Sequence, residues 1–179
     1  MISYMLDTDL FFLLNNLAGK SRLLDAIFVF LASDLQFFLI AAFLLLLFFS
    51  RKPLRDKTRM FAAAMLSGII ARGLLTEIIR FFWHRPRPFD AFSVVQLIPE
   101  DDWSFPSGHA AFFFAMAAAI YAYDKKWGIG FFLAAFLMNI SRIAAGVHYS
   151  SDILGGAAVG ISSAWIVLFL MKKYKIFAA

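Results

Sequence analysis

The chain has 179 residues, of which 62% are hydrophobic and only 16% are charged, and its net charge is +5. Soluble domains are usually about 45–50% apolar and about 25% charged, so the composition favours a membrane protein. The Lys and Arg residues gather at the ends of apolar runs and around a polar central segment. That distribution fits membrane topology and an anionic ligand better than a nucleic-acid surface. The length fits one domain, residues 1–179.

Cysteine is absent, which excludes a disulfide framework, a thiolate nucleophile and a cysteine-ligated metal. The N-terminus lacks a positive segment and a small-residue cleavage site, so we expect no cleaved signal peptide. The 23 Phe residues are interpreted as lipid-facing and packing side chains.

The first 33 residues predict short helices. Residues 9–17 are a short amphipathic run, and the Gly19-Lys20-Ser21 sequence interrupts the pattern. Residues 23–32 are apolar but fall short of the roughly 20 residues that a membrane helix needs. We interpret these runs as two interfacial or re-entrant helices, with one broken span as the alternative.

Longer apolar runs follow at residues 34–50, 58–83, 110–123, 127–140 and 153–171. The run at 110 continues back to Pro106 and Ser107, and the run at 127 is expected to reach about residue 145. Residues 85–105 are the only long non-helical stretch, and loops of this length are often functional. The sequence predicts an all-α, polytopic transmembrane bundle of about five to six helices with a short interfacial N-terminal segment.

Three basic clusters mark the ends of these runs, at residues 51–59, 125–126 and 172–175. If the runs alternate in direction, the three clusters share one face of the membrane. The positive-inside rule makes that face cytoplasmic. Residues 84–105 and 142–151 are then expected on the outer face of the plasma membrane.

Four arginines, Arg80, Arg85, Arg87 and Arg142, lie at or near the ends of apolar runs. Arginine is costly inside a membrane and tends to mark a functional site. The alternative, particularly for Arg85, is a side chain that reaches out to the interface. Arginine presents planar, paired donors that match phosphate, so the set predicts an anion site.

The sequence Pro106-Ser107-Gly108-His109 precedes an apolar helix. Free amide groups at a helix N-terminus bind anions, although a plain helix cap is the alternative. A cap does not require His109, which beside four arginines fits a proton donor or base.

His148 and Asp152 are four residues apart, so on a helix they share one face. A carboxylate that accepts a hydrogen bond from one ring nitrogen makes the other nitrogen a better nucleophile. The alternative is a purely structural His–Asp pair. Arg142, on the same predicted face, favours the functional interpretation.

The three histidines, at positions 84, 109 and 148, lack close ligand spacing such as H-E-x-x-H. Carboxylates are few near the clusters, so we expect no metal and no cofactor. The acidic residues 100–102 are interpreted either as a solvated loop or as a gate to the site.

Together these clusters resemble the three motifs of the type 2 phosphatidic acid phosphatase superfamily, K-x6-R-P, P-S-G-H and S-R-x5-H-x3-D. The first motif is matched with Arg80 in place of lysine, and the other two at every fixed position, over residues 80–152. The exchange keeps the positive charge and changes the donor geometry.

This resemblance implies a metal-independent lipid phosphatase. His148 would attack phosphorus and form a phosphohistidine, oriented by Asp152, while His109 would protonate the leaving oxygen and then help to activate water. Phosphoryl oxygens would be held by Arg80, Arg87, Arg142, Ser107 and Gly108. Such positioning and charge stabilisation are what phosphoryl transfer requires.

The run at residues 85–89 and the N-terminal region resemble bacterial undecaprenyl-diphosphate phosphatases, which recycle the cell-wall carrier lipid on the outer face of the plasma membrane. Phosphatidic acid, phosphatidylglycerol phosphate and lipid A are the alternative substrates. The expected partners are a lipid-linked phosphate or diphosphate and membrane lipids, with no nucleic acid and no obligate protein partner.

The competing function classes are a lipid-phosphate binding or transport protein and a structural membrane protein. A soluble vanadate-dependent haloperoxidase would share the pocket, but the apolar runs argue against it.

Overall fold

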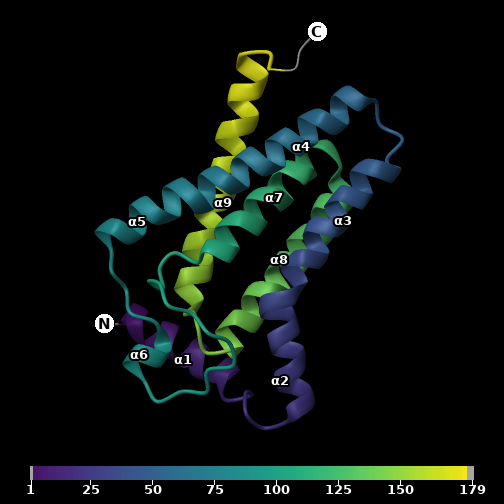
Figure 1. Cartoon of the computed structure of the whole chain (residues 1–179). Coiled ribbons are helices and arrows are strands. Elements are labelled where there is room, and N and C mark those ends of the chain that lie inside the picture. Colours follow the sequence, from purple (N-terminus) through teal and green to yellow (C-terminus); the bar gives the residue numbers. More distant parts are fainter. Residues whose placement is uncertain (1, 177–179) are drawn as a thin grey trace.

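In the computed structural model, residues 2–176 are described, and their regular structure is entirely helical (Figure 1). Within residues 2–176, four helices are long and apolar enough to cross a membrane: Arg22–Phe49, Leu54–Phe82, Lys125–Ala144 and Ser150–Lys173. This arrangement agrees with the polytopic helical bundle that composition and hydropathy predict.

The first span is one helix, which runs from α2 (Arg22–Val29) through a π-helical turn, η1 (Phe30–Asp34), into α3 (Leu35–Phe49). The prediction that residues 23–32 form a separate interfacial helix is therefore wrong. The wide turn keeps the backbone hydrogen-bonded past Asp34, since the Leu35 N–H donates to the Phe30 carbonyl. The short N-terminal helix is α1 (Ile2–Asn15).

The second span is also continuous and consists of α4 (Leu54–Ile69), the π-helical η2 (Ile70–Thr76) and α5 (Glu77–Phe82). The loop after it contains only the one-turn helix α6 (Pro88–Ala91), as the predicted non-helical stretch requires. The remaining helices are α7 (Gly108–Tyr123), α8 (Lys125–Ala144) and α9 (Ser150–Lys173).

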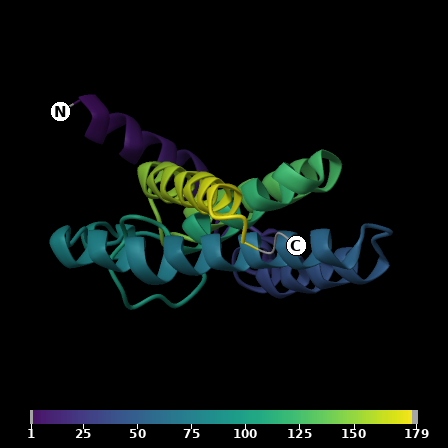
Figure 2. The ribbon, with the colours of Figure 1, turned by 90° about the horizontal axis from the view of Figure 1, so that it is seen from above.

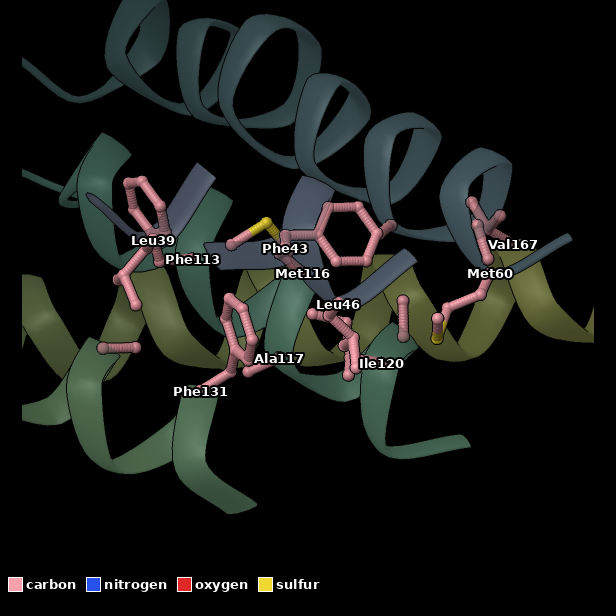
Figure 3. Packing of buried hydrophobic residues seen from close by; sticks show 14 of the residues in the cluster. Leu39, Phe43, Leu46, Met60, Phe113, Met116, Ala117, Ile120, Phe131 and Val167 are labelled. Atoms are coloured by element: carbon pink, nitrogen blue, oxygen red, sulfur yellow. The ribbon is translucent and has the colours of Figure 1, made fainter. Parts of the chain in front are cut away.

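Helix α7 is the centre of the bundle and packs against α4, α8 and α9. Its 16 residues are fewer than a lipid-exposed span needs, but here neighbouring helices cover most of its surface. Figure 3 shows its side chains Met116 and Ile120 packed with Phe43 of α3 and Met60 of α4. In the view from above, the long helix from α4 to α5 runs across the whole bundle (Figure 2).

The basic clusters share one end of the bundle, as the predicted alternation of directions requires. Lys52, between α3 and α4, lies 3.5 Å from Asp124, between α7 and α8. Arg59 of α4 lines a pocket with Lys172 and Lys175 from the end of α9. The loop 83–107 and the α8–α9 connection lie at the opposite end, beside α1 (Figure 1).

Close packing of α7 against α9 requires a small residue at position 160. A β-carbon on Gly160 would collide with the Ala111 carbonyl and lie 2.9 Å from the Ala115 nitrogen. Small residues at such crossings let two helix backbones approach each other in membranes.

We therefore expect Gly160→Leu to destabilise the protein by at least about 2 kcal/mol, because neither helix backbone can move away cheaply. Thermal unfolding of the detergent-solubilised protein measures the loss. Gly130→Leu is the matched control, since a β-carbon at Gly130 meets nothing within 4 Å. Equal melting temperatures for the two variants would contradict this packing.

Candidate active site

Three segments that are distant in sequence meet at the end of the bundle opposite the basic clusters. They are the end of α5 with the following loop, the first turn of α7, and the segment from the last turn of α8 to the first turn of α9. These segments carry the eight residues that the sequence singled out: Arg80, Arg87, Ser107, Gly108, His109, Arg142, His148 and Asp152.

His148 is 1% exposed and lies between an acidic and a basic neighbour. Its Nδ1 is 3.4 Å from the Asp152 Oδ2 atom, and its Nε2 is 3.4 Å from the Arg87 Nη1 atom. Because a carboxylate only accepts, the neutral ring is assigned with its proton on Nδ1. The lone pair of Nε2 then points toward the arginine side of the site.

Burial lowers the pKa of His148 to about 4, and the charges of Arg142 and Arg87 act in the same direction. The hydrogen bond to Asp152 opposes them and raises the pKa. His148 is therefore uncharged at neutral pH, which is the state that a nucleophilic imidazole needs.

Asp152 lies in the first turn of α9 and is fully buried. Its Oδ2 accepts hydrogen bonds from the Ser104 hydroxyl at 2.5 Å and from the Tyr149 N–H at 2.8 Å. The second of these bonds closes the N-terminus of α9, where negative charge is favourable. The carboxylate thus joins the start of a transmembrane helix to His148.

Arg85 completes the environment of Asp152, to whose Oδ1 it donates at 2.6 Å. It also donates to Ser151 at 2.6 Å and to Asp7 of α1 at 2.7 Å, and its guanidinium lies 4.1 Å from the centre of the Tyr149 ring. Burial alone would lower the pKa of Arg85, but Asp152 and Asp7 outweigh it and raise the pKa. Arg85 therefore points into the protein and does not reach out to the interface.

The other three arginines bind two carboxylates of the loop before α7. Asp102 pairs with Arg80 and Arg87, and Glu100 pairs with Arg87 and Arg142. Burial raises the pKa of Asp102, yet the hydrogen bond from Arg87 and the charge of Arg80 prevail and lower it. Glu100 and Asp102 are therefore not merely part of a solvated loop, because both form ion pairs with arginines of the site.

Main-chain carbonyls fix the orientation of the same arginines. Arg80 donates to the Pro106 carbonyl at 3.1 Å, and Arg142 to that of Ala32, in the η1 turn, at 3.0 Å. The buried Nε atoms of Arg80 and Arg142 have no hydrogen-bond partner among the described residues. The cluster therefore keeps donors for further anionic oxygens.

The first turn of α7 brings the second motif beside this cluster. The Ser107 hydroxyl accepts from the Ala110 N–H at 3.4 Å, and the Ser107 N–H donates to the Asp152 carbonyl at 3.0 Å. Ser107 thus caps the helix, which was the alternative interpretation of this motif, and its own amide is engaged. His109 is half-buried and lines a pocket of about 220 Å³ with Arg72 of η2 and Gln36 of α3.

Sequence reasoning missed Asp7, Ser104 and Arg72. Ser104 lies two residues before the second motif, where a serine in a loop carries no recognisable signal. Asp7 is 144 residues from its partner Ser151, so no local pattern connects them. Among residues 2–176, no group of three or more His, Cys, Asp or Glu side chains is arranged to hold a metal ion.

The sequence profile of the PAP2 superfamily matches residues 61–176, which include all three motifs. The bacitracin transport permease protein BcrC of Bacillus licheniformis is 31% identical over 94% of this chain and 82% of its own length. The undecaprenyl-diphosphatase BcrC of Bacillus subtilis strain 168 is 29% identical over 93% of this chain and 82% of its own.

A solved structure shares the fold. The crystal structure of Aquifex aeolicus LpxE superposes with a TM-score of 0.70 at 32% sequence identity. The match covers 92% of this chain and 95% of that chain. The similarity therefore extends beyond the motifs to the arrangement of the helices.

The buried position of His148 predicts its titration. Its imidazole should stay neutral until the pH falls to about 4, and Asp152→Asn should lower this pKa further, because Asp152 raises it. Histidine-selective NMR of the detergent-solubilised protein measures both values, with His148→Gln assigning the resonance. A midpoint near 6.5 in the folded protein would contradict the geometry.

Because Glu100 and Asp102 pair with the arginine cluster, we expect them to compete with inorganic anions for these arginines. Glu100→Gln should bind orthophosphate about tenfold more tightly than the unaltered protein, because two arginines lose a charged partner. Isothermal titration calorimetry measures the affinity. Asp101→Asn is the control, since Asp101 is exposed and forms no ion pair within residues 2–176; an equal gain there would indicate a general effect of charge.

Proposed function

The chain belongs to the PAP2 superfamily of membrane lipid phosphatases, and on that premise we propose that it hydrolyses undecaprenyl diphosphate to undecaprenyl phosphate and phosphate. The observation that carries this proposal is a buried, uncharged His148 whose Nε2 lies 3.4 Å from Arg87, in a site that also contains Arg80 and Arg142. That arrangement suits in-line attack on a phosphoryl group held by planar, paired donors.

In this mechanism, Nε2 of His148 attacks the terminal phosphorus and forms a phosphohistidine. Asp152 holds Nδ1–H, so that positive charge developing on the ring is stabilised. His109 donates a proton to the bridging oxygen as the P–O bond breaks. It then takes a proton from the water that hydrolyses the phosphohistidine.

Arg80, Arg87 and Arg142 bind the phosphoryl oxygens and stabilise the charge of the transition state. In the structure their donors are paired with Asp102 and Glu100. The phosphoryl group takes the place of those carboxylates, assisted by Ser107 and Gly108 at the start of α7. Metal ions have no part in this scheme.

We place the site on the outer face of the plasma membrane, because the three basic clusters lie at the other end of the bundle and positive charge favours the cytoplasmic side. An undecaprenyl-diphosphatase among the relatives supports the carrier-lipid substrate. The alternative substrates are phosphatidic acid, phosphatidylglycerol phosphate and lipid A, because the arginine cluster recognises phosphate and makes no choice of lipid tail.

A substrate panel tests the proposal. The purified protein in detergent with EDTA should release phosphate from undecaprenyl diphosphate with a higher kcat/KM than from phosphatidic acid or phosphatidylglycerol phosphate. If phosphate were released from none of these lipids, the assignment as a lipid phosphatase would be overturned. A preference for a glycerophospholipid would overturn the carrier-lipid substrate only.

The nucleophile has its own test. His148→Gln should lose essentially all turnover, and Asp152→Asn should lose about 10³–10⁴-fold in kcat, by analogy with loss of the orienting carboxylate in other His-dependent enzymes. Rapid acid-free quenching with ³²P-labelled substrate should trap an alkali-stable, acid-labile phosphoprotein only when His148 is present. Trapping of the same species in His148→Gln would contradict the assignment.

A further inference from the structure

Arg72 is a charged residue inside a membrane-spanning helix. It lies in η2, within the span Leu54–Phe82, and it is exposed. At 1.5 Å per residue it is about 15 Å along the helix from the Phe82 end. An arginine at such a position is costly unless it serves a function.

The side chain of Arg72 is directed toward the active site. A β-carbon on Gly108 would collide with its Nη1 atom and lie 3.3 Å from its Cζ atom, so the guanidinium lies against the backbone at the start of α7. The absence of a side chain at Gly108 permits this approach. η2 itself is a π-helical turn, a feature that is rare and often found at functional sites.

Arg72 differs from the other arginines of the site in having no partner. Arg80, Arg85, Arg87 and Arg142 each form an ion pair with a carboxylate. Arg72 forms no hydrogen bond or ion pair with any residue between 2 and 176. A cation left unpaired beside a cluster of cations favours binding of an anion from outside the chain.

The pocket that Arg72 lines has a polar part and an apolar part. His109, Arg72 and Gln36 line it, and its remaining walls are apolar side chains of α3 and α7, Ile40, Phe112 and Phe113. In the proposed mechanism His148 bonds to the phosphorus and His109 protonates the leaving oxygen, and His109 shares this pocket with Arg72. The part of the substrate next to Arg72 is therefore the leaving group.

We propose that Arg72, with Gln36 at the same pocket, binds the phosphate that remains on the lipid, and that this subsite makes the enzyme prefer lipid diphosphates over lipid monophosphates. This inference rests on the proposed function and deepens it. It assigns a second phosphate site, separate from the cluster that holds the reacting phosphoryl group.

The chemistry of the leaving group gives the subsite its selectivity. When Nε2 of His148 bonds to the terminal phosphorus, the bond to the bridging oxygen breaks and its electron pair stays on that oxygen. From a diphosphate, the leaving group is a lipid phosphate, whose charge Arg72 stabilises while His109 supplies the proton. From a monophosphate, the leaving group is an alcohol with no phosphate for Arg72 to bind.

The experiment compares Arg72→Gln with the unaltered protein on two matched pairs of ligands. The first pair, farnesyl diphosphate and farnesyl monophosphate, is compared by kcat/KM. The second pair, methylene diphosphonate and orthophosphate, is compared by binding affinity in calorimetry, which requires no turnover. Arg59→Gln is the matched control, because Arg59 lies on the same long helix but lines the pocket at the opposite end.

Arg72→Gln should lower kcat/KM for the diphosphate and affinity for the diphosphonate by about 10- to 100-fold, the range for loss of a charge-assisted hydrogen bond. Values for monophosphate and orthophosphate should change less than about threefold, and Arg72→Lys should recover part of the loss. Equal losses on both members of a pair would overturn the inference and indicate that Arg72 binds bulk lipid or supports the fold. Failure of the unaltered protein to hydrolyse any lipid phosphate would overturn the proposed function, while the calorimetry would still decide the role of Arg72.

Discussion

Asp152 is a buried carboxylate whose two oxygens are shared by four groups from three parts of the chain: Arg85, Ser104, and the neighbouring Tyr149 N–H and His148. A carboxylate without access to water requires such partners, because its desolvation is otherwise prohibitive. These contacts fix the start of α9, the loop before α7 and the ring of His148 together. Through Arg85 they also attach α1, whose Asp7 accepts from the same guanidinium. Formation of the site and docking of the N-terminal helix are thus coupled.

The same requirement for paired charge explains the state of the arginines. Glu100 and Asp102 supply the negative charge that Arg80, Arg87 and Arg142 need. A substrate phosphate replaces one set of anionic oxygens with another, so binding has to displace the loop as well as desolvate the phosphate. Arg72 lacks such a carboxylate. In the proposed subsite its charge, beside His109, serves the phosphate that remains on the lipid. The site thereby separates recognition of the reacting phosphate from recognition of the leaving group.

Much of this arrangement could be predicted from the sequence. Apolar runs predict the spans because their length is set by the bilayer. The spacing of His148 and Asp152 predicts that they pair, and they do, but the expected reason is wrong: His148 lies in the extended segment before α9, so this segment and not a shared helical face brings it to Asp152. The continuity of residues 22–49 was missed, since a π-helical turn at Asp34 has no sequence signature. Arg85 could not be distinguished from an interfacial arginine, because its partners Asp7 and Asp152 are brought to it only by the fold. The sequence does not indicate a role for Arg72 for the same reason, because its contact with Gly108 joins two helices.

The central claim is that the Nε2 atom of His148 attacks a phosphoryl group held by Arg80, Arg87 and Arg142. These are the arginines that form ion pairs with Glu100 and Asp102. A structure determined with orthovanadate, a mimic of the phosphoryl transition state, tests it most directly. The account predicts vanadium bonded to His148 Nε2, its oxygens bound by Arg80, Arg87 and Arg142, and both carboxylates displaced. Vanadate bound elsewhere, or bound while Glu100 and Asp102 keep their ion pairs with these arginines, would contradict it.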